Sequence, residues 1–541
     1  MVKSFTRSRS RKTVTAVIMT MVFAALVSGV FSNRAEAADK EVLVLARSMD
    51  LNSLDPHRAW CDTCKVVNGI AYETLIKLGK DNKTIEPGVA KSWEAGADGM
   101  SYTFHLDERA VFSDGSPVES KDVKWSLFRL KHMKAGPDMY AKTISRIDTP
   151  DPHTVVITVS GWPSELLAQL VVPYAGVVNS DVAKAHGADN GPDAIKDKAE
   201  PWFLKNSAGS APFVLESYRP DEEVRYIRNE NYWKKKPALK QIIIKQVKDA
   251  VSQAQMLESG SVDIAMQIDA DTAKMIRSKD VVIKSQPSYY FIYVGMFPAA
   301  KTKTALTLKI RQAIGYALDY EGLINVTVGG AGRVQPSVVP VEFPGGSGLP
   351  MPKRDLEKAR KLLAEAGVPN GFDVNLVYLN MTQYGVDFNI LVQKIQQDLK
   401  KVGIKVNLIP VPGFPQWIEH RSKATMPMTI IWWAADYVGT APYVQYFSMT
   451  PGSRWLWMAS NTGPDMPELI NKREVALVKK LQTATARKAG PLYHEMAKEM
   501  VKDRIVIPLV NPNLLLTYRK NVKGMRYDII TELSFDEIYK Q

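Results

Sequence analysis

The chain has 541 residues, which exceeds one ordinary hydrophobic core and predicts two or three domains. Hydrophobic residues make up 45% and charged residues 23% of the sequence, as in packed globular proteins, so disordered and fibrous classes are excluded. The formal net charge is +13, but after Lys12 the basic residues form no long run, which argues against a nucleic-acid binder.

The first 37 residues have the order of an export signal. A basic stretch precedes an apolar stretch over 14–27, and Ala35-Glu36-Ala37 provides small residues at the two positions that a signal peptidase recognises. A transmembrane anchor is the alternative, but the apolar run is shorter than the ~20 residues that span a bilayer. We therefore expect Sec-dependent export to the periplasm and cleavage after Ala37.

The first half of the mature chain alternates between short β-branched stretches and turns. Glu41–Ala46 is short and apolar, as in a buried strand, and 52–64 is rich in turn-forming residues and predicts a loop. The same criteria predict a turn over 112–117, a helix over 122–130 and strands over 154–159, 242–247 and 281–283.

The only two cysteines, Cys61 and Cys64, lie in the predicted loop as Cys-Asp-Thr-Cys. Two nearby thiols in an oxidising compartment most often form a disulfide. A metal site is an alternative, because His57 adds a third potential ligand, but a structural zinc site needs a fourth and none is nearby. A redox role is a weaker alternative, because no strand-then-helix pattern of the thioredoxin kind surrounds the motif. Free thiols are the remaining alternative. We predict a Cys61–Cys64 disulfide and no metal site.

The second half has longer helical patterns. Apolar residues recur at three- and four-residue spacing over 309–318, 356–366 and 388–399, and Gly367 and Gly403 follow the last two as helix stops. Strands are predicted over 404–409 and 428–433. Alternating strands and helices indicate an α/β architecture with mixed sheets.

Catalytic signatures are sparse in this chain. His494-Glu495 lacks the second histidine of a zinc-protease helix, and 345–348 lacks the strand-turn-helix context of a nucleophile elbow. The glycines at 329–332 are not followed by the Lys-Ser/Thr of a phosphate loop. We expect a binding protein without a cofactor, and a secreted hydrolase is the alternative outside the receptor class.

An ordered series of motifs covers nearly the whole mature chain. Residues 90–106 have the sequence AKSWEAGADGMSYTFHL, and FSDGSP follows at 112–117. Later motifs are GSAPF at 209–213, NENYW at 229–233, MLESGSVD at 256–263, RQAIGYALD at 311–319 and ARKLLAEAG at 359–367. This series resembles the family 5 extracellular solute-binding proteins, the receptors of bacterial ABC importers for peptides, nickel and related ligands.

The resemblance implies an α/β, two-lobed periplasmic binding protein of type II, cluster C, with an extra third domain. Lobe I would be discontinuous and an insert domain would interrupt it; the residues implied are 38–85, 205–286 and 515–541 for lobe I, 86–204 for the insert and 287–514 for lobe II. The motif that begins at residue 90 would build the fold and not contact the ligand.

The resemblance also implies a ligand site at Trp433-Ala434-Ala435-Asp436-Tyr437, which is similar to the Trp-x-x-Asp-Tyr/Asn element of the family's peptide receptors. There the aspartate pairs with the ligand's α-ammonium group and the preceding strand offers backbone hydrogen bonds. A carboxylate in a closed, dry cleft favours a ligand that brings a cation. The alternatives are a surface turn for Asp436 and a core aromatic for Trp433.

Two further regions would line the same cleft. Trp60 and Cys61 map to the stretch that peptide receptors place against the ligand, and Arg421 lies where an oligopeptide receptor has a cation for the peptide carboxylate. A solvated helix charge is the alternative for Arg421. The chain departs from the family at Ile430, where an arginine can help to hold a carboxylate, and after Tyr437, where VGTAP replaces the commoner Asp-Pro.

These implications predict a monomeric receptor that binds a short peptide or peptide-like amine, does not bind nucleic acid, and delivers its ligand to an ABC permease in the inner membrane. An oligosaccharide stays open as the ligand, because Trp432, Trp433, Trp455 and Trp457 could stack on sugar rings. A metal chelate is the third ligand class.

Overall fold

The computed structural model describes residues 39–434, 437–460 and 467–541. A mixed 12-stranded sheet runs through it in the order β18-β15-β19-β13-β20-β11-β1-β10-β9-β8, with β12 and β14 paired to β20. The strands are β1 (Val42–Arg47), β8 (Phe213–Arg219), β9 (Glu223–Arg228), β10 (Gln241–Gln246), β11 (Ile264–Ala265), β12 (Val281–Pro287), β13 (Phe291–Met296), β14 (Gly332–Arg333), β15 (Asp373–Leu379), β18 (Lys405–Val411), β19 (Met428–Trp433) and β20 (Val506–Arg519).

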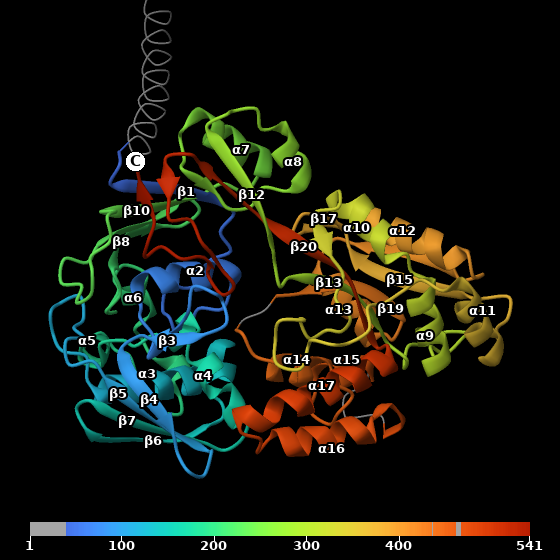
Figure 1. Ribbon diagram of the computed structural model, residues 1–541, viewed down its shortest axis with the longest axis horizontal. Helices are drawn as coiled ribbons and strands as arrows, with labels where there is room; N and C mark the ends of the chain where they lie inside the picture. The colour runs from blue at the N-terminus through green and yellow to red at the C-terminus, as the bar shows by residue number, and fades with distance from the viewer. Residues whose placement is uncertain (1–38, 435–436, 461–466) are drawn as a thin grey trace, which may run out of the picture.

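Two neighbouring strand segments connect the two halves of this sheet. β20 has 14 residues; its first part pairs with β13, and its last part pairs with β11 and β12. The chain crosses in the other direction between the end of β12 and the start of β13. Figure 1 shows β20 and the β12–β13 connection passing between a blue-to-green half and a yellow-to-orange half. We call these the N-terminal half and the C-terminal half.

In the C-terminal half, helices cover both faces of the sheet because side chains alternate between faces along each strand. Ile292 and Val294 of β13 belong to one buried cluster, and Phe291 and Tyr293 belong to another. The first cluster includes residues of α9 (Leu308–Ala317), α10 (Tyr320–Val328), α11 (Leu356–Glu365) and α12 (Phe388–Lys400). The second includes residues of α13 (Phe414–Ser422), α14 (Ala441–Phe447), α15 (Arg454–Ala459), α16 (Lys472–Leu481) and α17 (Ala486–Asp503).

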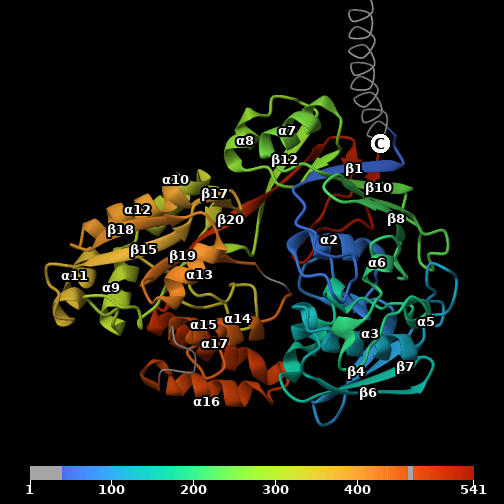
Figure 2. The same ribbon diagram turned by 180° about the vertical axis from the view of Figure 1, so that it is seen from behind.

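The N-terminal half combines its part of the large sheet with a separate antiparallel sheet of order β4-β5-β7-β6. The view from behind in Figure 2 shows this second sheet and α3 at the lower edge, below α2. The elements are α2 (Asp62–Ala71), β4 (Ala90–Ala95), β5 (Ser101–Leu106), α3 (Ser120–Met133), β6 (Ile144–Asp151), β7 (Thr154–Val159), α7 (Ala250–Ser259) and α8 (Ala270–Met275). The motif at residues 90–106 thus forms β4 and β5, and the stretch 112–117 leads to α3.

A buried ion network ties the second sheet to the start of the chain. The guanidinium of Arg129 on α3 donates to the carboxylates of Asp55 and Asp197, and the side chains of all three residues are almost completely buried. His57 contacts this network through Nδ1, which lies 3.2 Å from Arg129 Nη1. Burial and the Arg129 charge lower the pKa of His57 to about 4.

The α/β prediction is confirmed, and the predicted strands at 154–159 and 428–433 match β7 and β19. The predicted loop 52–64 is wrong at its end, because α2 begins at Asp62. The sequence gives only a weak signal for the start of α2, because turn-forming residues precede Cys61 and continue directly into the first turn of the helix. The predicted export signal, cleavage after Ala37 included, lies outside the described residues, and the domain limits stay a prediction.

Among the described ranges, no helix combines the length and the apolar character that crossing a bilayer requires.

Candidate functional site

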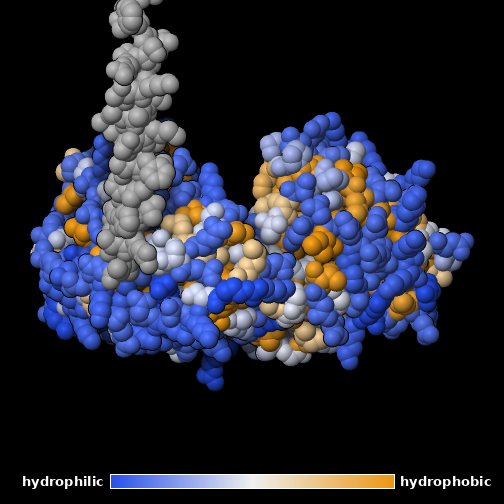
Figure 3. Space-filling view, turned by 90° about the horizontal axis from the view of Figure 1, so that it is seen from above, coloured by the Kyte–Doolittle hydropathy of each residue, from blue (hydrophilic) through white to orange (hydrophobic). Residues whose placement is uncertain are grey.

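A cavity of about 500 Å³ lies between the two halves. The N-terminal half contributes Arg47, Asp62 and Asp269 to its wall, and the C-terminal half contributes Tyr384 from the hairpin β16–β17 (Thr382–Gln383 and Val386–Asp387). Tyr290, at the crossing between β12 and β13, also lines it. Seen from above, the surface of the molecule is hollowed between the two halves (Figure 3). A cavity enclosed by two separately folded halves is a frequent place for a ligand.

One hydrogen-bonded network runs along the wall of this cavity. Arg47 is 1% exposed, and its guanidinium forms a two-pronged ion pair with Glu532. The Tyr290 hydroxyl donates to Glu532 at 2.9 Å, and the Tyr290 ring stacks on Tyr384 with centroids 4.1 Å apart. The network therefore links the end of β1, the crossing strands, the hairpin and the C-terminal segment.

Two residues of the network have strained backbones. Tyr384 has φ +51° and Glu532 has φ +64°, in the left-handed region that side chains other than glycine rarely adopt. Such conformations cost on the order of 1 kcal/mol each and persist where the surroundings fix them, often at ligand sites. Both residues line the same cavity, which supports a binding role for it.

Four aromatic residues from both halves meet near the start of α2. The Tyr140 ring lies 6.1 Å from Trp60, 5.8 Å from Tyr174 and 5.8 Å from Tyr437, measured between centroids. Trp60 is 37% exposed, whereas Tyr437 is buried. The structure thus brings together the predicted site residues Trp60 and Tyr437, which lie on opposite halves.

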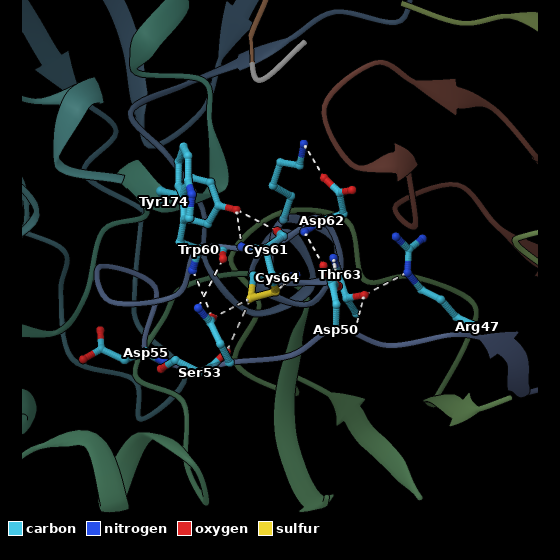
Figure 4. The surroundings of a disulfide bond; sticks show 12 residues. Arg47, Asp50, Ser53, Asp55, Trp60, Cys61, Asp62, Thr63, Cys64 and Tyr174 are labelled. Carbon is cyan, nitrogen blue, oxygen red and sulfur yellow. Dashed lines mark hydrogen bonds and ion pairs between the residues drawn. A yellow bond between two sulfur atoms is a disulfide. The ribbon is translucent and has the colours of Figure 1, made fainter. Parts of the chain in front are cut away.

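Cys61 and Cys64 form a disulfide at the start of α2 (Figure 4). Cys61 is the N-cap of the helix, and its sulfur accepts a hydrogen bond from the Cys64 backbone N–H at 3.0 Å. The Tyr174 hydroxyl donates to the Cys61 carbonyl at 2.9 Å. Cys61 therefore lies between the aromatic residues and Asp62, which lines the cavity. No group of three or more metal-ligating side chains occurs in the part of the chain that the structure describes.

Trp433 and Ala434 lie half-buried at the carboxyl end of β19, the edge that faces the other half. The Trp433 ring packs against Tyr446, with centroids 4.3 Å apart, and Phe447. Trp433 Nε1 is buried and has no hydrogen-bond acceptor among the described residues. A buried donor without an acceptor is uncommon in folded proteins and suits a ligand wall. Ala435 and Asp436 lie outside the described residues.

Arg421 lies at the carboxyl end of α13. Its guanidinium and that of Arg454 both lie 4.3 Å from the centre of the Trp457 ring. Burial and the positive charge of Arg454 lower the pKa of Arg421. No hydrogen bond, ion pair or ring contact within the described ranges joins Arg421 to Trp433 or Tyr437. Its predicted contact with the ligand stays a prediction.

Glu165 also joins the two halves. It is the last residue of the short 3₁₀ helix Pro163–Glu165, is 2% exposed, and accepts hydrogen bonds from the Tyr493 hydroxyl at 2.6 Å and the Ala441 backbone N–H at 3.3 Å. Burial raises the pKa of Glu165. Sequence reasoning missed this residue and the network of Arg47, Tyr290, Tyr384 and Glu532. They share no motif and come from distant segments, so no local signal identifies them.

The model of the bacterial extracellular solute-binding proteins, family 5 Middle, matches residues 84–454. The chain is 26% identical over 512 residues to the probable D,D-dipeptide-binding periplasmic protein DdpA of Escherichia coli K12, covering 92% of this chain and 94% of that protein. It is 28% identical over 393 residues to heme-binding protein A of Haemophilus influenzae, covering 68% and 69%.

Solved structures share the fold. The periplasmic binding protein DppA of Helicobacter pylori in complex with the peptide STSA superposes with a TM-score of 0.71 at 22% identity, covering 92% of this chain and 98% of that one. The two-lobed architecture of these binding proteins is the architecture of this chain.

Proposed function

The chain belongs to the bacterial extracellular solute-binding proteins of family 5, receptors of ABC importers, and on that premise we propose that it binds a short peptide or peptide-like amine between its two halves. In this proposal residues 38–85, 205–286 and 515–541 form one lobe, residues 287–514 form the other, and residues 86–204 are an added domain. No bond of the ligand is made or broken.

The cavity between the halves is the observation that carries this proposal. Its wall carries groups of both signs, as a zwitterion requires: Asp62, which also pairs with Lys65, and Asp269, which also caps α8, are negative, and Lys248 is positive. Trp433 Nε1 supplies a buried donor at the adjacent strand end. The relatives named for dipeptides and the peptide complex of a solved neighbour favour the same ligand class.

Closure of the two halves explains how binding would be signalled. A ligand that contacts both walls shifts the equilibrium toward the closed form, and excluding water strengthens its polar contacts. The crossing strands β12–β13 and β20 are the natural hinge, because no other segment of the described chain connects the halves. A permease that prefers the closed form would then accept the ligand. The export signal predicted from the sequence favours the periplasm for this step.

Mass spectrometry of small molecules released by denaturing freshly purified protein tests the proposal. We expect a peptide or peptide-like amine among them, and we expect it to raise the melting temperature when it is added to ligand-free protein. A released sugar or metal chelate that does so would keep the receptor role and overturn the ligand class. Chemical turnover of an added peptide or glycan would favour the hydrolase alternative.

A further inference from the structure

The hairpin β16–β17 ends in a two-residue turn with an unusual residue at its first position. Gln383 pairs with Val386, so Tyr384 and Gly385 form the turn, and their φ angles are +51° and +76°. Two successive residues with positive φ fit a type I′ turn, in which asparagine, aspartate or glycine ordinarily takes the first position. Such strain persists where the surroundings require the residue, so the ring of Tyr384 has a role beyond the turn.

The tip of this hairpin forms part of the cavity wall where the two halves meet. The Tyr384 ring lines the cavity and stacks on Tyr290 with 13° between the two ring planes. Tyr290 is 7% exposed and its hydroxyl is bonded to Glu532, so Tyr384 packs on a fixed partner. A Cβ on Gly385 would lie 3.7 Å from the Cβ of Asp269 at the start of α8. Both ribbon views place β17 beside β20 at this junction (Figures 1 and 2).

Much of the cavity wall is apolar. Arg47 and Glu532 direct their charges at each other and leave little unpaired charge for a ligand. A large apolar group that enters the cavity leaves water, which favours binding in proportion to the area covered. The aliphatic side chains that line the cavity come from the N-terminal half, from α10 and from β20, and are Met266, Ile268, Val328, Leu514 and Leu515.

The strained aromatic tip and the aliphatic wall together indicate the side chain of the ligand. We propose that the receptor selects a ligand with a large apolar or aromatic side chain, which the Tyr384 ring and the aliphatic wall enclose. This inference rests on the proposed peptide receptor and deepens it by naming that side chain. Small-molecule sites are ordinarily lined in this way by apolar and aromatic groups, while a few polar groups fix the orientation of the ligand.

Two dipeptides of identical charge test the side-chain preference. L-alanyl-L-phenylalanine and L-alanyl-L-alanine have the same termini and differ only by one phenyl group. We expect the ligand-free protein to bind alanylphenylalanine at least tenfold more tightly in isothermal titration calorimetry, because the phenyl group leaves water. Equal measurable affinities, or tighter binding of alanylalanine, would overturn the proposal.

Variants at the tip of the hairpin test the role of Tyr384. In Tyr384→Asn we expect the preference to fall below threefold while the melting temperature hardly changes, because the lost stack and the relieved turn offset each other. Tyr384→Phe keeps the ring and should keep the preference. Tyr539→Asn, at an exposed tyrosine outside the cavity wall, is the matched control. A lower melting temperature of Tyr384→Asn with an unchanged preference would show that the stack serves stability alone, and would overturn the proposal.

A neutral probe separates the apolar wall from the peptide class. N-phenyl-1-naphthylamine carries no ammonium or carboxylate group, and its fluorescence rises when it leaves water. We expect the wild-type protein and Tyr384→Phe to bind it at least fivefold more tightly than Tyr384→Asn. Probe binding of this kind without binding of either dipeptide would keep the apolar selection and reject the peptide class. Equal probe affinities of the wild-type protein and Tyr384→Asn would refute the role of Tyr384.

Discussion

At the scale of single residues, Asp436 carries the prediction that is most specific to the ligand. A carboxylate that pairs with an α-ammonium group in a closed cleft contributes a charge-assisted hydrogen bond. Asp436→Ala should therefore weaken binding of a peptide with a free amino terminus by tenfold or more, as measured by isothermal titration calorimetry.

An N-acetylated form of the same peptide is the control for this prediction. It lacks the cation, so its already weak binding should hardly change in the variant. Equal loss for both peptides would mean that the residue supports the cleft without contacting the amine, and unchanged affinity for both would remove Asp436 from the site.

Protonation of Glu474 should make the folding stability depend on pH. Glu474 is 0% exposed, its Oε2 accepts from the Met449 N–H at 2.6 Å, and its Oε1 has no partner among the described residues. Burial, with the negative charges of Asp503 and Glu499, raises the pKa of Glu474 well above its ordinary value. The folded state therefore binds this proton more tightly than the unfolded state.

The sign of the effect follows from that difference. Below the ordinary glutamate pKa of about 4.3, the stability that the protonated Glu474 carboxyl contributes is fully present. Between that pH and the raised pKa of the folded state, the free energy of unfolding falls by at most about 1.4 kcal/mol per pH unit as the pH rises. Glu474→Gln should raise the melting temperature at pH 7 to 8 and flatten its decline with pH. The exposed Glu468→Gln is the control, and identical pH profiles for the two variants would contradict the assignment.

At the scale of elements, β13 and α15 approach so closely that only glycine fits between them. A Cβ on Gly295 would lie 2.4 Å from the ring of Trp455, which is completely buried. Gly295→Ala should lower the free energy of unfolding by about 1–3 kcal/mol through overpacking.

Gly490 on α17 is the opposite case and serves as the matched control. A Cβ there meets no atom within 4 Å, but Pro491 follows directly and limits the helical gain, so Gly490→Ala should change the free energy of unfolding by less than about 0.5 kcal/mol. Chemical denaturation of both variants measures these changes. A stabilised Gly295→Ala would show that α15 lies farther from β13 than described.

At the scale of the whole molecule, several contacts join the two halves. Tyr384 stacks on Tyr290 at the crossing strands, Tyr437 contacts Tyr140, and Glu165 contacts Tyr493 and Ala441. Trp162, which precedes Glu165, has φ +53°, and its N–H donates to the Gln482 carbonyl at 2.8 Å. A strained backbone persists where its surroundings fix it, so the left-handed conformation of Trp162 fits a role for this contact in holding the two halves together.

Removing Glu165 should therefore shift the ligand-free protein toward the open form. With spin labels on the exposed positions Lys142 and Lys479, Glu165→Ala should lengthen the distance between labels, because the hydrogen bonds from Tyr493 and Ala441 are lost. Glu165→Gln keeps an acceptor of the same shape and should lengthen it less. An unchanged distance in a folded Glu165→Ala protein would show that this contact does not hold the closed form.

Local patterns were sufficient to predict the family, the α/β class and individual strands such as β7 and β19, because period-two alternation and ordered motifs are properties of neighbouring residues. The Cys-Asp-Thr-Cys spacing likewise predicted the disulfide. The start of α2 was missed, since its N-cap is a cysteine and not one of the residues that ordinarily mark a helix start.

The sequence by itself therefore determined the identity of the fold and the candidate residues Trp433 and Trp60. Only the tertiary structure decided which residues form the cavity wall and the contacts across it. Arg47 and Glu532 are 485 positions apart, and Glu165 and Tyr493 are 328 apart. Such pairs leave no trace in a local pattern, because the partners become neighbours only in the tertiary structure: Arg47 meets Glu532 when the C-terminal segment packs into the N-terminal half, and Glu165 meets Tyr493 across the two halves.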